Sequence, residues 1–288
     1  MKKFGIILLG FFIFAGTLFA QSRLNAGARQ LEPEVAAQQL AEFKNFRMPG
    51  DFCLQFRIVH KPRNSDEERH FAGTLWGTWI DGAPRMRITL RRLLETGDTL
   101  VSPTQTSRRL LMIGGEKPEL WEANEQGVPV KIDAKNTEPF FDGIVIAPFD
   151  LQTPFIYWKD FEYLRTERLR GRVSHFYKLF PPQDFKVAHP EIAAVQIAMD
   201  RTYNALVNVA TLGRNDKMLK NFSLGSVKKV NEDYIFKTLD VRDERYRDKD
   251  TFEVKKAALR LALPADYFVP AALEKPDLQM PVSIFEKL

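Results

Sequence analysis

The sequence HFYKLF at residues 175–180 opens a block of six apolar segments that decides the fold. The other five read IAAVQIAM at 192–199, YNALVNVATL at 203–212, MLKNFSLGSV at 218–227, YIFKTLDV at 234–241 and TFEVKKAALRLAL at 251–263. Turn-forming or charged residues separate them, as at Pro181-Pro182 and Asp200-Arg201. Short strands at this even spacing predict an antiparallel sheet that curls or closes. The gaps are too short for the crossover helices that a parallel sheet requires.

Further strands are expected before this block. Residues 52–58 read FCLQFRI, and alternation places one apolar set on a single side of the strand: Phe52, Leu54, Phe56 and Ile58. The strand His70–Ile80 carries Leu75, Gly77 and Trp79 on one face, and Arg85–Leu90 presents Met86, Ile88 and Leu90. Arg108–Ile113 and Pro118–Ala123 are expected to add two more strands. The chain is therefore mainly β, with a strongly apolar inner face on the first strands.

A short amphipathic helix is expected to begin at Pro33, a residue that suits the first turn of a helix. Ala36, Leu40 and Phe43 then fall on one helical stripe. Pro49-Gly50 ends the helix, and the polar residues 21–32 before it form a loose lead.

Aromatic residues crowd residues 148–172 without a clean alternation, and Pro148 and Pro154 interrupt the segment. We expect short helices or a loop that acts as a gate. The alternative is an aromatic plug that seals one end of a barrel as ordinary core. Gly143–Ile146, just before it, is expected to form a short strand or a helical turn.

The N-terminus carries the pattern of a secretory signal peptide over Met1–Ala20. Lys2 and Lys3 precede an apolar run that ends in Leu18-Phe19-Ala20. That run of about 16 residues is shorter than the roughly 20 that span a bilayer, which favours a cleaved signal over a membrane anchor. The mature protein is expected in the periplasm, without a stable membrane span.

The mature chain is close to neutral and holds one cysteine. Removing Lys2 and Lys3 lowers the formal net charge from +5 to +3, and both signs are interspersed along the chain. Nucleic-acid binding needs Lys and Arg clustered on one face, so no nucleic-acid partner is expected. Cys53 stands alone in an alternating apolar run, so it is expected to be a core residue in a protein without a disulfide.

The sequence contains no convergent polar set of the kind that an enzyme needs. The four histidines lack metal-ligand spacing, and no Gly-x-Ser-x-Gly elbow is present. The carboxylates and arginines of Asp240–Asp250 are expected to form a solvated hairpin tip rather than an acid–base pair with split pKa values. We therefore expect neither catalysis nor a cofactor or metal.

The order of these features resembles the LolA-like family of outer-membrane lipoprotein-sorting proteins, over roughly Val35 to Phe268. The resemblance rests on the signal, the helix, the FCLQF strand, GTLW at 73–76, LLMIGG at 110–115, LW at 120–121, the Trp158–Tyr163 segment and LPADYF at 263–268. It implies one domain over residues 33–269, an incomplete antiparallel β-barrel wrapped over a few short helices. Residues 270–288 extend beyond it, as an edge strand or a docking arm.

The resemblance also implies a function. Members hold the acyl chains of a lipoprotein in an apolar cavity between sheet and helices. They receive the cargo from an inner-membrane transporter and deliver it to an outer-membrane acceptor. In the best-known members an arginine three residues after the strand tryptophan holds the lid closed. Counted from Trp76, that position here is Trp79, so a latch of that kind is not expected in this chain.

The inner-face residues above are the candidate lipid-binding set, with ordinary core packing as the alternative for each: Phe52, Leu54, Phe56, Leu75, Trp79, Met86, Ile88 and Leu90. The candidate gate consists of Phe155, Trp158 and Phe161. A second reading of the same fold is an envelope sensor of lipid or lipoprotein, or an accessory subunit of a membrane transporter. Carrier and sensor differ in their partners rather than in their pocket.

Overall fold

The computed structural model describes residues 13–15, 29–96, 99–101, 107–133, 135–203 and 205–288. The predicted signal peptide lies outside the described residues except for Ile13–Ala15, which form the short strand β1. Most of the expected lead, residues 21–28, also lies outside them.

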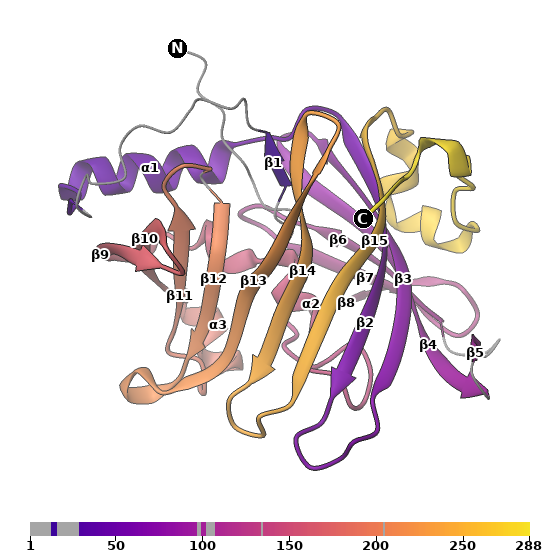
Figure 1. Ribbon diagram of the computed structural model, residues 1–288, viewed down its shortest axis with the longest axis horizontal. Helices are drawn as coiled ribbons and strands as arrows, with labels where there is room; N and C mark the ends of the chain where they lie inside the picture. The colour runs from indigo at the N-terminus through magenta and orange to yellow at the C-terminus, as the bar shows by residue number, and fades with distance from the viewer. Residues whose placement is uncertain (1–12, 16–28, 97–98, 102–106, 134, 204) are drawn as a thin grey trace.

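One antiparallel sheet organises the molecule (Figure 1), and its strands follow the order β8-β7-β6-β4-β3-β2-β15-β14-β13-β12-β11-β10-β9. Strands β8 and β9 stand at opposite ends of this order, so the described residues form a curved sheet that does not close. The mainly β, incomplete barrel expected from the sequence is confirmed. The first half of the chain forms β2 (Asp51–Lys61), β3 (Arg69–Ile80), β4 (Ala83–Thr96), β5 (Thr99–Val101), β6 (Ser107–Ile113), β7 (Glu119–Ala123) and β8 (Pro129–Ile132).

The second half is the meander that the apolar segments predict. Consecutive strands pair antiparallel from β9 to β15, and β15 then pairs with β2 to join the two halves. The strands are β9 (Asp160–Leu169), β10 (Arg172–Phe180), β11 (Ala194–Asp200), β12 (Ala205–Leu212), β13 (Met218–Val230), β14 (Asp233–Asp243) and β15 (Lys249–Leu261).

Strand β9 corrects the expectation that residues 148–172 hold only short helices or a loop. It lies at the end of the sheet and pairs on one side only, with β10. Its side chains are mostly half-buried on both faces, and Thr166 alone is fully buried. A strand in that position shows little hydrophobic alternation, which is why the sequence pattern missed it.

Short helices cover the concave side of the sheet, and α2 lies inside its curve (Figure 1). α1 (Pro33–Asn45) buries Ala36, Leu40 and Phe43, as the helical stripe predicts. The Tyr177 hydroxyl of β10 donates to the Ala36 carbonyl over 3.0 Å and ties α1 to the sheet. The other helices are α2 (Pro148–Gln152), the 3₁₀ turns η1 (Pro154–Tyr157) and η2 (Arg214–Asp216), and α3 (Gln183–Ala188).

A second apolar cluster lies on the outer face of the sheet, under the end of the chain. Cys53 and Trp76 of β2 and β3 pack there with Tyr267, Phe268 and Leu273. Residues 265–288 form the elements that cover it, η3 (Ala265–Phe268), η4 (Pro270–Glu274), η5 (Val282–Ile284) and β16 (Glu286–Lys287). Strand β2 is therefore buried on its outer face too at Cys53, whereas Gln55 and Arg57 on that face stay half-buried.

Arg87 of β4 anchors this terminal segment. Its fully buried guanidinium donates to the carbonyls of Ala272 and Lys275 over 2.7 and 2.8 Å. It also lies 4.1 Å from the ring centroid of Tyr267 and 3.3 Å from an Asp277 carboxylate oxygen. A buried cation is tolerated only with such partners, so residues 267–277 and the sheet fold as one unit.

Cys53 is expected to resist thiol reagents in the folded protein. Burial raises the pKa of its thiol to about 12, with a contribution from the Asp277 carboxylate, and the thiolate is the reactive form. A thiol-reactive dye at pH 8 should label less than about a tenth of the native protein in an hour and all of it in guanidinium. Rapid labelling of the native protein would show that the segment over Cys53 opens readily.

Candidate functional site

The concave face of the sheet gathers the residues that the sequence nominated. Seven of the eight inner-face candidates are at most 2% exposed and belong to one apolar cluster. Trp79 is half-buried at its edge, where the Arg47 guanidinium lies 4.8 Å from its ring centroid. The structure thus brings Phe52, Leu54, Phe56, Leu75, Trp79, Met86, Ile88 and Leu90 together on one side of β2, β3 and β4.

The chain's own side chains fill this concave face. Residues 140–158, here called the plug, run inside the curve of the sheet and bury nine apolar side chains in the same cluster: Phe140, Ile144, Val145, Ile146, Phe149, Leu151, Phe155, Ile156 and Trp158. Two cavities beside the plug measure only about 10 and 70 Å³. The first is the size of a single water site. In the part of the chain that the structure describes, the plug therefore occupies the concave face.

Two of the three gate candidates belong to the plug. Phe149 lies 5.7 Å from Phe155 and 6.4 Å from Trp158 between ring centroids, and Trp158 lies 5.1 Å from Phe185 of α3. Phe161, the third, is half-buried in strand β9 and packs 6.3 Å from Tyr177. The aromatic ring set is therefore centred on α2, η1 and α3, with Phe161 on the neighbouring sheet edge.

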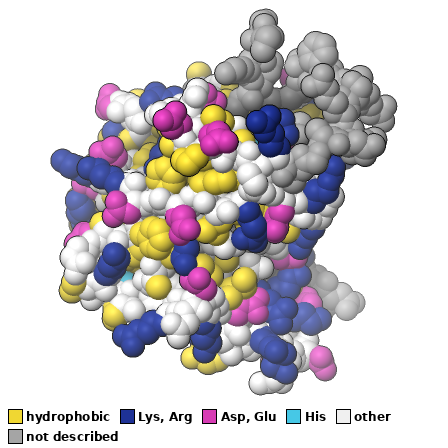
Figure 2. Space-filling view, turned by 90° about the vertical axis from the view of Figure 1, so that its left-hand side faces the viewer, with side chains coloured by type: hydrophobic (Ala, Val, Ile, Leu, Met, Phe, Trp, Pro, Cys, Tyr) yellow, Lys and Arg dark blue, Asp and Glu magenta, His cyan; other side chains and the backbone are white. Residues whose placement is uncertain are grey.

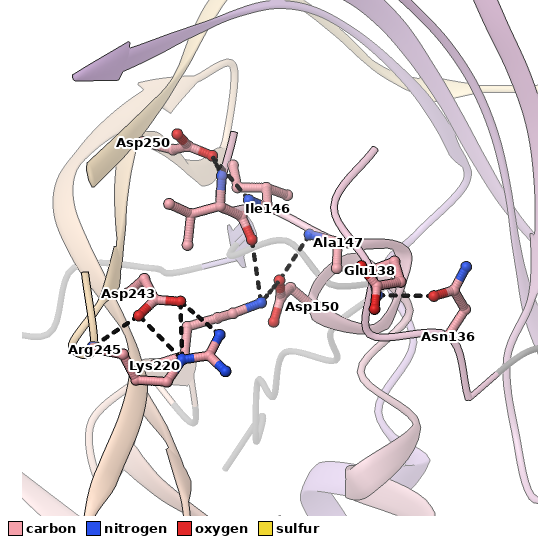
Figure 3. Close-up of polar contacts among 10 residues, drawn as sticks. Asn136, Glu138, Ile146, Ala147, Asp150, Lys220, Asp243, Arg245 and Asp250 are labelled. Atoms are coloured by element: carbon pink, nitrogen blue, oxygen red, sulfur yellow. Dashed lines mark hydrogen bonds and ion pairs between the residues drawn. The ribbon is translucent and has the colours of Figure 1, made fainter. Parts of the chain in front are cut away.

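Asp250 of β15 holds the plug by its backbone (Figure 3). One carboxylate oxygen accepts the N–H groups of Val145 and Ile146 over 2.6 and 2.8 Å, and the other lies 2.7 Å from Nδ1 of His60. Asp250 and His60 are both buried, at 0% and 2% exposed. Three elements distant in sequence, β2, β15 and the plug, therefore meet at one carboxylate.

Lys220 of β13 makes a second polar link to the plug. Its ammonium donates to Asp150 over 2.8 Å and to the Val145 carbonyl over 3.2 Å, as Figure 3 shows. The same Asp150 oxygen accepts the N–H of Ala147. Both side chains of the ion pair are less than a fifth exposed. Charge-assisted bonds in such surroundings are stronger than surface ion pairs.

Asp250 contradicts the expectation that Asp240–Asp250 forms a solvated tip. Its side chain is fully buried, and Asp243 is 6% exposed and bonds to Arg245 over 2.7 Å. The sequence does carry a signal for Asp250, because it is in phase with Phe252 and Val254, two inward residues of the same strand. A charged residue in phase with a buried face needs a partner.

A groove of about 620 Å³ lies at the gap between the two ends of the sheet. Its walls are the β6–β7 turn, residues 115–118, on one side and η1, the start of β9 and α3 on the other. Aromatic side chains of the plug, the end of β10 and α3 line it, with lysines and carboxylates around them: Lys117, Lys135, Tyr157, Trp158, Lys159, Asp160, Phe180, Asp184 and Phe185. Its size is typical of a small-molecule site.

Tyr157 is the unusual polar residue of the groove. Its hydroxyl is buried and has no hydrogen-bond partner among the described residues. Burial raises the pKa of Tyr157 to about 12, against a smaller lowering effect of Arg47.

Figure 2 shows the side of the molecule that carries α1, β9 and β10 in Figure 1, where hydrophobic patches alternate with charges of both signs.

Comparison with known proteins places this fold. No protein-family model and no curated protein sequence matches the chain. The solved structure of a domain named for outer membrane lipoprotein sorting, from Vibrio parahaemolyticus, is similar with a TM-score of 0.66 at 15% identity. The match covers 84% of this chain and 97% of that one.

Two further solved structures are similar. A DUF1329 family protein from Desulfovibrio piger gives a TM-score of 0.64 at 12% identity, over 83% of this chain and 98% of that one. A LolA superfamily protein from Nitrosomonas europaea gives 0.58 at 12% identity, over 82% and 98%. The chain therefore has a LolA-like fold, which confirms the resemblance seen in the sequence at the level of the fold.

Proposed function

We propose that the chain is a periplasmic lipid-binding carrier, which holds the acyl chains of a lipoprotein on the concave face of the sheet. The LolA-like fold supports this proposal, and so does the apolar lining of that face by β2, β3 and β4. Cargo would come from an inner-membrane transporter and go to an outer-membrane acceptor. The carrier performs no covalent chemistry.

The observation that carries the proposal is the plug. A segment of 19 residues (140–158) covers the concave face, and it is bonded to the sheet through the side chains of Asp250 and Lys220. Burying an acyl chain yields about 0.8 kcal/mol per CH₂, or roughly 10 kcal/mol for a long chain. Displacing the apolar side chains of the plug offsets much of this gain. Lipid and plug would thus exchange on one surface, which keeps binding reversible.

The groove at the gap of the sheet offers the entry route. Tyr157 and Trp158 of the plug line this groove, so an acyl chain that enters it meets aromatic side chains of the plug first. The Tyr157 hydroxyl, which is buried without a partner among the described residues, would offer a hydrogen bond to an ester or amide group of the cargo once the plug moves. The lysines and carboxylates that also line the groove suit the polar part of the cargo, which would stay in the groove while the acyl chain is buried.

Localisation follows from the proposed signal peptide together with the fold. No helix in the described part of the chain is long and apolar enough to cross a membrane. The described residues also hold no group of three or more side chains suited to a metal ion. We propose export through cleavage after Ala20 and residence in the periplasm.

Native mass spectrometry of the exported protein tests the proposal. The expected spectrum contains a species heavier by the mass of a lipid or of a diacylated lipopeptide, and organic extraction should return that molecule. Protein that carries no lipid, and takes up none from diacylated lipopeptide micelles, would contradict the carrier function while leaving the fold intact.

Substituting Lys220→Met should increase lipid uptake. Loss of a charge-assisted bond of about 1.5 kcal/mol favours release of the plug by roughly tenfold. Lipopeptide bound at subsaturating concentration, measured by native mass spectrometry, should rise accordingly. Lys228→Met, an exposed lysine of the same strand, is the matched control and should bind as the wild type does. Equal uptake by both variants would show that the plug does not compete with lipid.

A further inference from the structure

The sheet is split between β14 and β15. Among the described residues, these neighbours pair only between Thr238–Arg242 and Lys249–Glu253. Beyond Thr238, Asp233–Lys237 of β14 stays paired with β13, while Val254–Leu261 of β15 stays paired with β2. The two edges that no longer pair with each other, which we call the seam, diverge toward one end of the molecule (Figure 1).

Strands of the chain itself occupy both edges of the seam. Ile13–Ala15 (β1) pairs antiparallel with Asp233–Ile235 of β14, and β16 pairs antiparallel with Lys256 and Ala257 of β15. Leu288 follows β16 and donates its N–H to the Lys255 carbonyl over 3.1 Å. Both edges therefore accept an added strand.

The seam leads to the main apolar cluster. Ile235 and Phe236 on one side and Val254 and Ala257 on the other are fully buried members of it. At the far end the Arg260 guanidinium reaches across to both oxygens of Asp233, over 2.8 and 3.0 Å. An apolar side chain that enters the seam finds apolar neighbours there.

We propose that the Asp233–Lys237 edge binds an extended apolar peptide segment of another protein by antiparallel strand addition. The segment takes the place that Ile13–Ala15 holds in the full chain. That strand lies in the proposed signal peptide, so its removal on export frees the edge. Main-chain hydrogen bonds supply affinity in this mode of recognition, and alternate side chains supply specificity.

The surroundings of the edge restrict its occupant to a single strand. β16 already holds the facing edge of β15. Lys237 and Lys255 flank the seam, and lysines at sheet edges oppose pairing with another whole sheet. A short, unfolded and mainly apolar peptide segment fits this edge, because it adds one strand and brings no second sheet. This edge lies on β14 rather than on the lining strands β2, β3 and β4, although all four strands contribute to one apolar cluster. The inference rests on the proposed cleavage of the signal peptide, and it does not require acyl-chain binding.

Amide hydrogen exchange on the chain starting at Gln21 tests the proposal. Among the residues that the structure describes, the members of the apolar clusters lie between residues 31 and 288, so we expect this shortened chain to keep its core. The probe is a synthetic peptide of residues 10–18 with two added lysines at each end. A saturating amount should slow exchange of the residue 233–237 amides by about tenfold. These amides should already be slow in the full-length chain.

Two controls decide between specific and general binding. A peptide N-methylated at alternate residues cannot complete the ladder and should give no protection, and the amides of β8, at the end of the sheet, should not change with either peptide. Unaltered exchange at 233–237 overturns the proposal. So does equal protection by the N-methylated peptide, or protection of the plug instead of β14.

Discussion

Replacing Asp250 with alanine is expected to lower the free energy of unfolding by about 3 to 5 kcal/mol, because each buried hydrogen-bonding group that loses its partner costs about 1 to 3 kcal/mol. The substitution strands the N–H groups of Val145 and Ile146 and removes the carboxylate beside His60. All of these groups are buried, so water does not replace the lost acceptor. The loss should appear in urea unfolding monitored by tryptophan fluorescence. Exchange of the Val145 and Ile146 amides should accelerate in parallel.

Two control variants separate this effect from a general loss of charge. Asp250→Asn keeps an oxygen acceptor for the plug amides and should lose less stability than the alanine variant. Asp248→Ala removes a carboxylate whose one hydrogen bond within the described residues is to the backbone N–H of the exposed Arg63, and should change stability by less than about 0.5 kcal/mol. An Asp250→Ala protein within 1 kcal/mol of the wild type would show that Asp250 does not hold the plug.

Acidification is expected to destabilise the protein through His175 of β10. Burial, together with the nearby Arg201 charge, lowers the pKa of His175 from 6.5 to about 4, against the opposing effect of Asp200. Its Nδ1 bonds to Thr166 over 2.7 Å, and its Nε2 is buried without a partner among the described residues. The folded protein therefore keeps this ring neutral where the unfolded chain protonates it.

The sign follows from that difference. Stability from His175 is fully present above pH 6.5 and falls as the pH drops toward 4, by about 3 kcal/mol in total. Urea unfolding at pH 7.5 and 4.5 should show this loss in the wild type. His175→Gln, which can still bond to Thr166 but does not titrate, should show a loss smaller by about 2 to 3 kcal/mol. Parallel pH profiles of the two proteins would contradict this assignment.

The meander was predictable because burial on one face leaves an alternating pattern. In β14 and β15, Leu239, Val241, Phe252 and Val254 all point to the core, and turns punctuate the strands between them. Helix α1 was predictable for the same reason, because its single apolar stripe is buried against the cluster.

Strands at the ends of the sheet escaped prediction for the opposite reason. β8 and β9 each pair on one side and bury little, so their residues follow no strict alternation. The role of the terminal segment was equally hidden. Its anchor, Arg87, lies in an ordinary alternation of basic and apolar residues, and only the fold brings the carbonyls of Ala272 and Lys275 to it.

The apolar residues of the candidate site could be predicted from the sequence, whereas its polar contacts could not. Strand phase identified the inner-face residues, since Phe52, Leu54 and Phe56 share one side of β2. The contacts that close the site join residues more than 70 positions apart, such as Asp250 with Val145 and Lys220 with Val145. Spacing in one sequence carries no information on such pairs, because they depend on how the whole sheet curves.

The central claim is that acyl chains and the plug compete for the concave face. Its most direct test is amide exchange at Val145 and Ile146, the two plug residues bonded to Asp250, with and without a bound diacylated lipopeptide. Lipid-bound protein should exchange both amides at least about tenfold faster, while the paired amides of β2 and β3 stay unchanged. Lipid bound at full occupancy with both plug amides as slow as before would contradict the account.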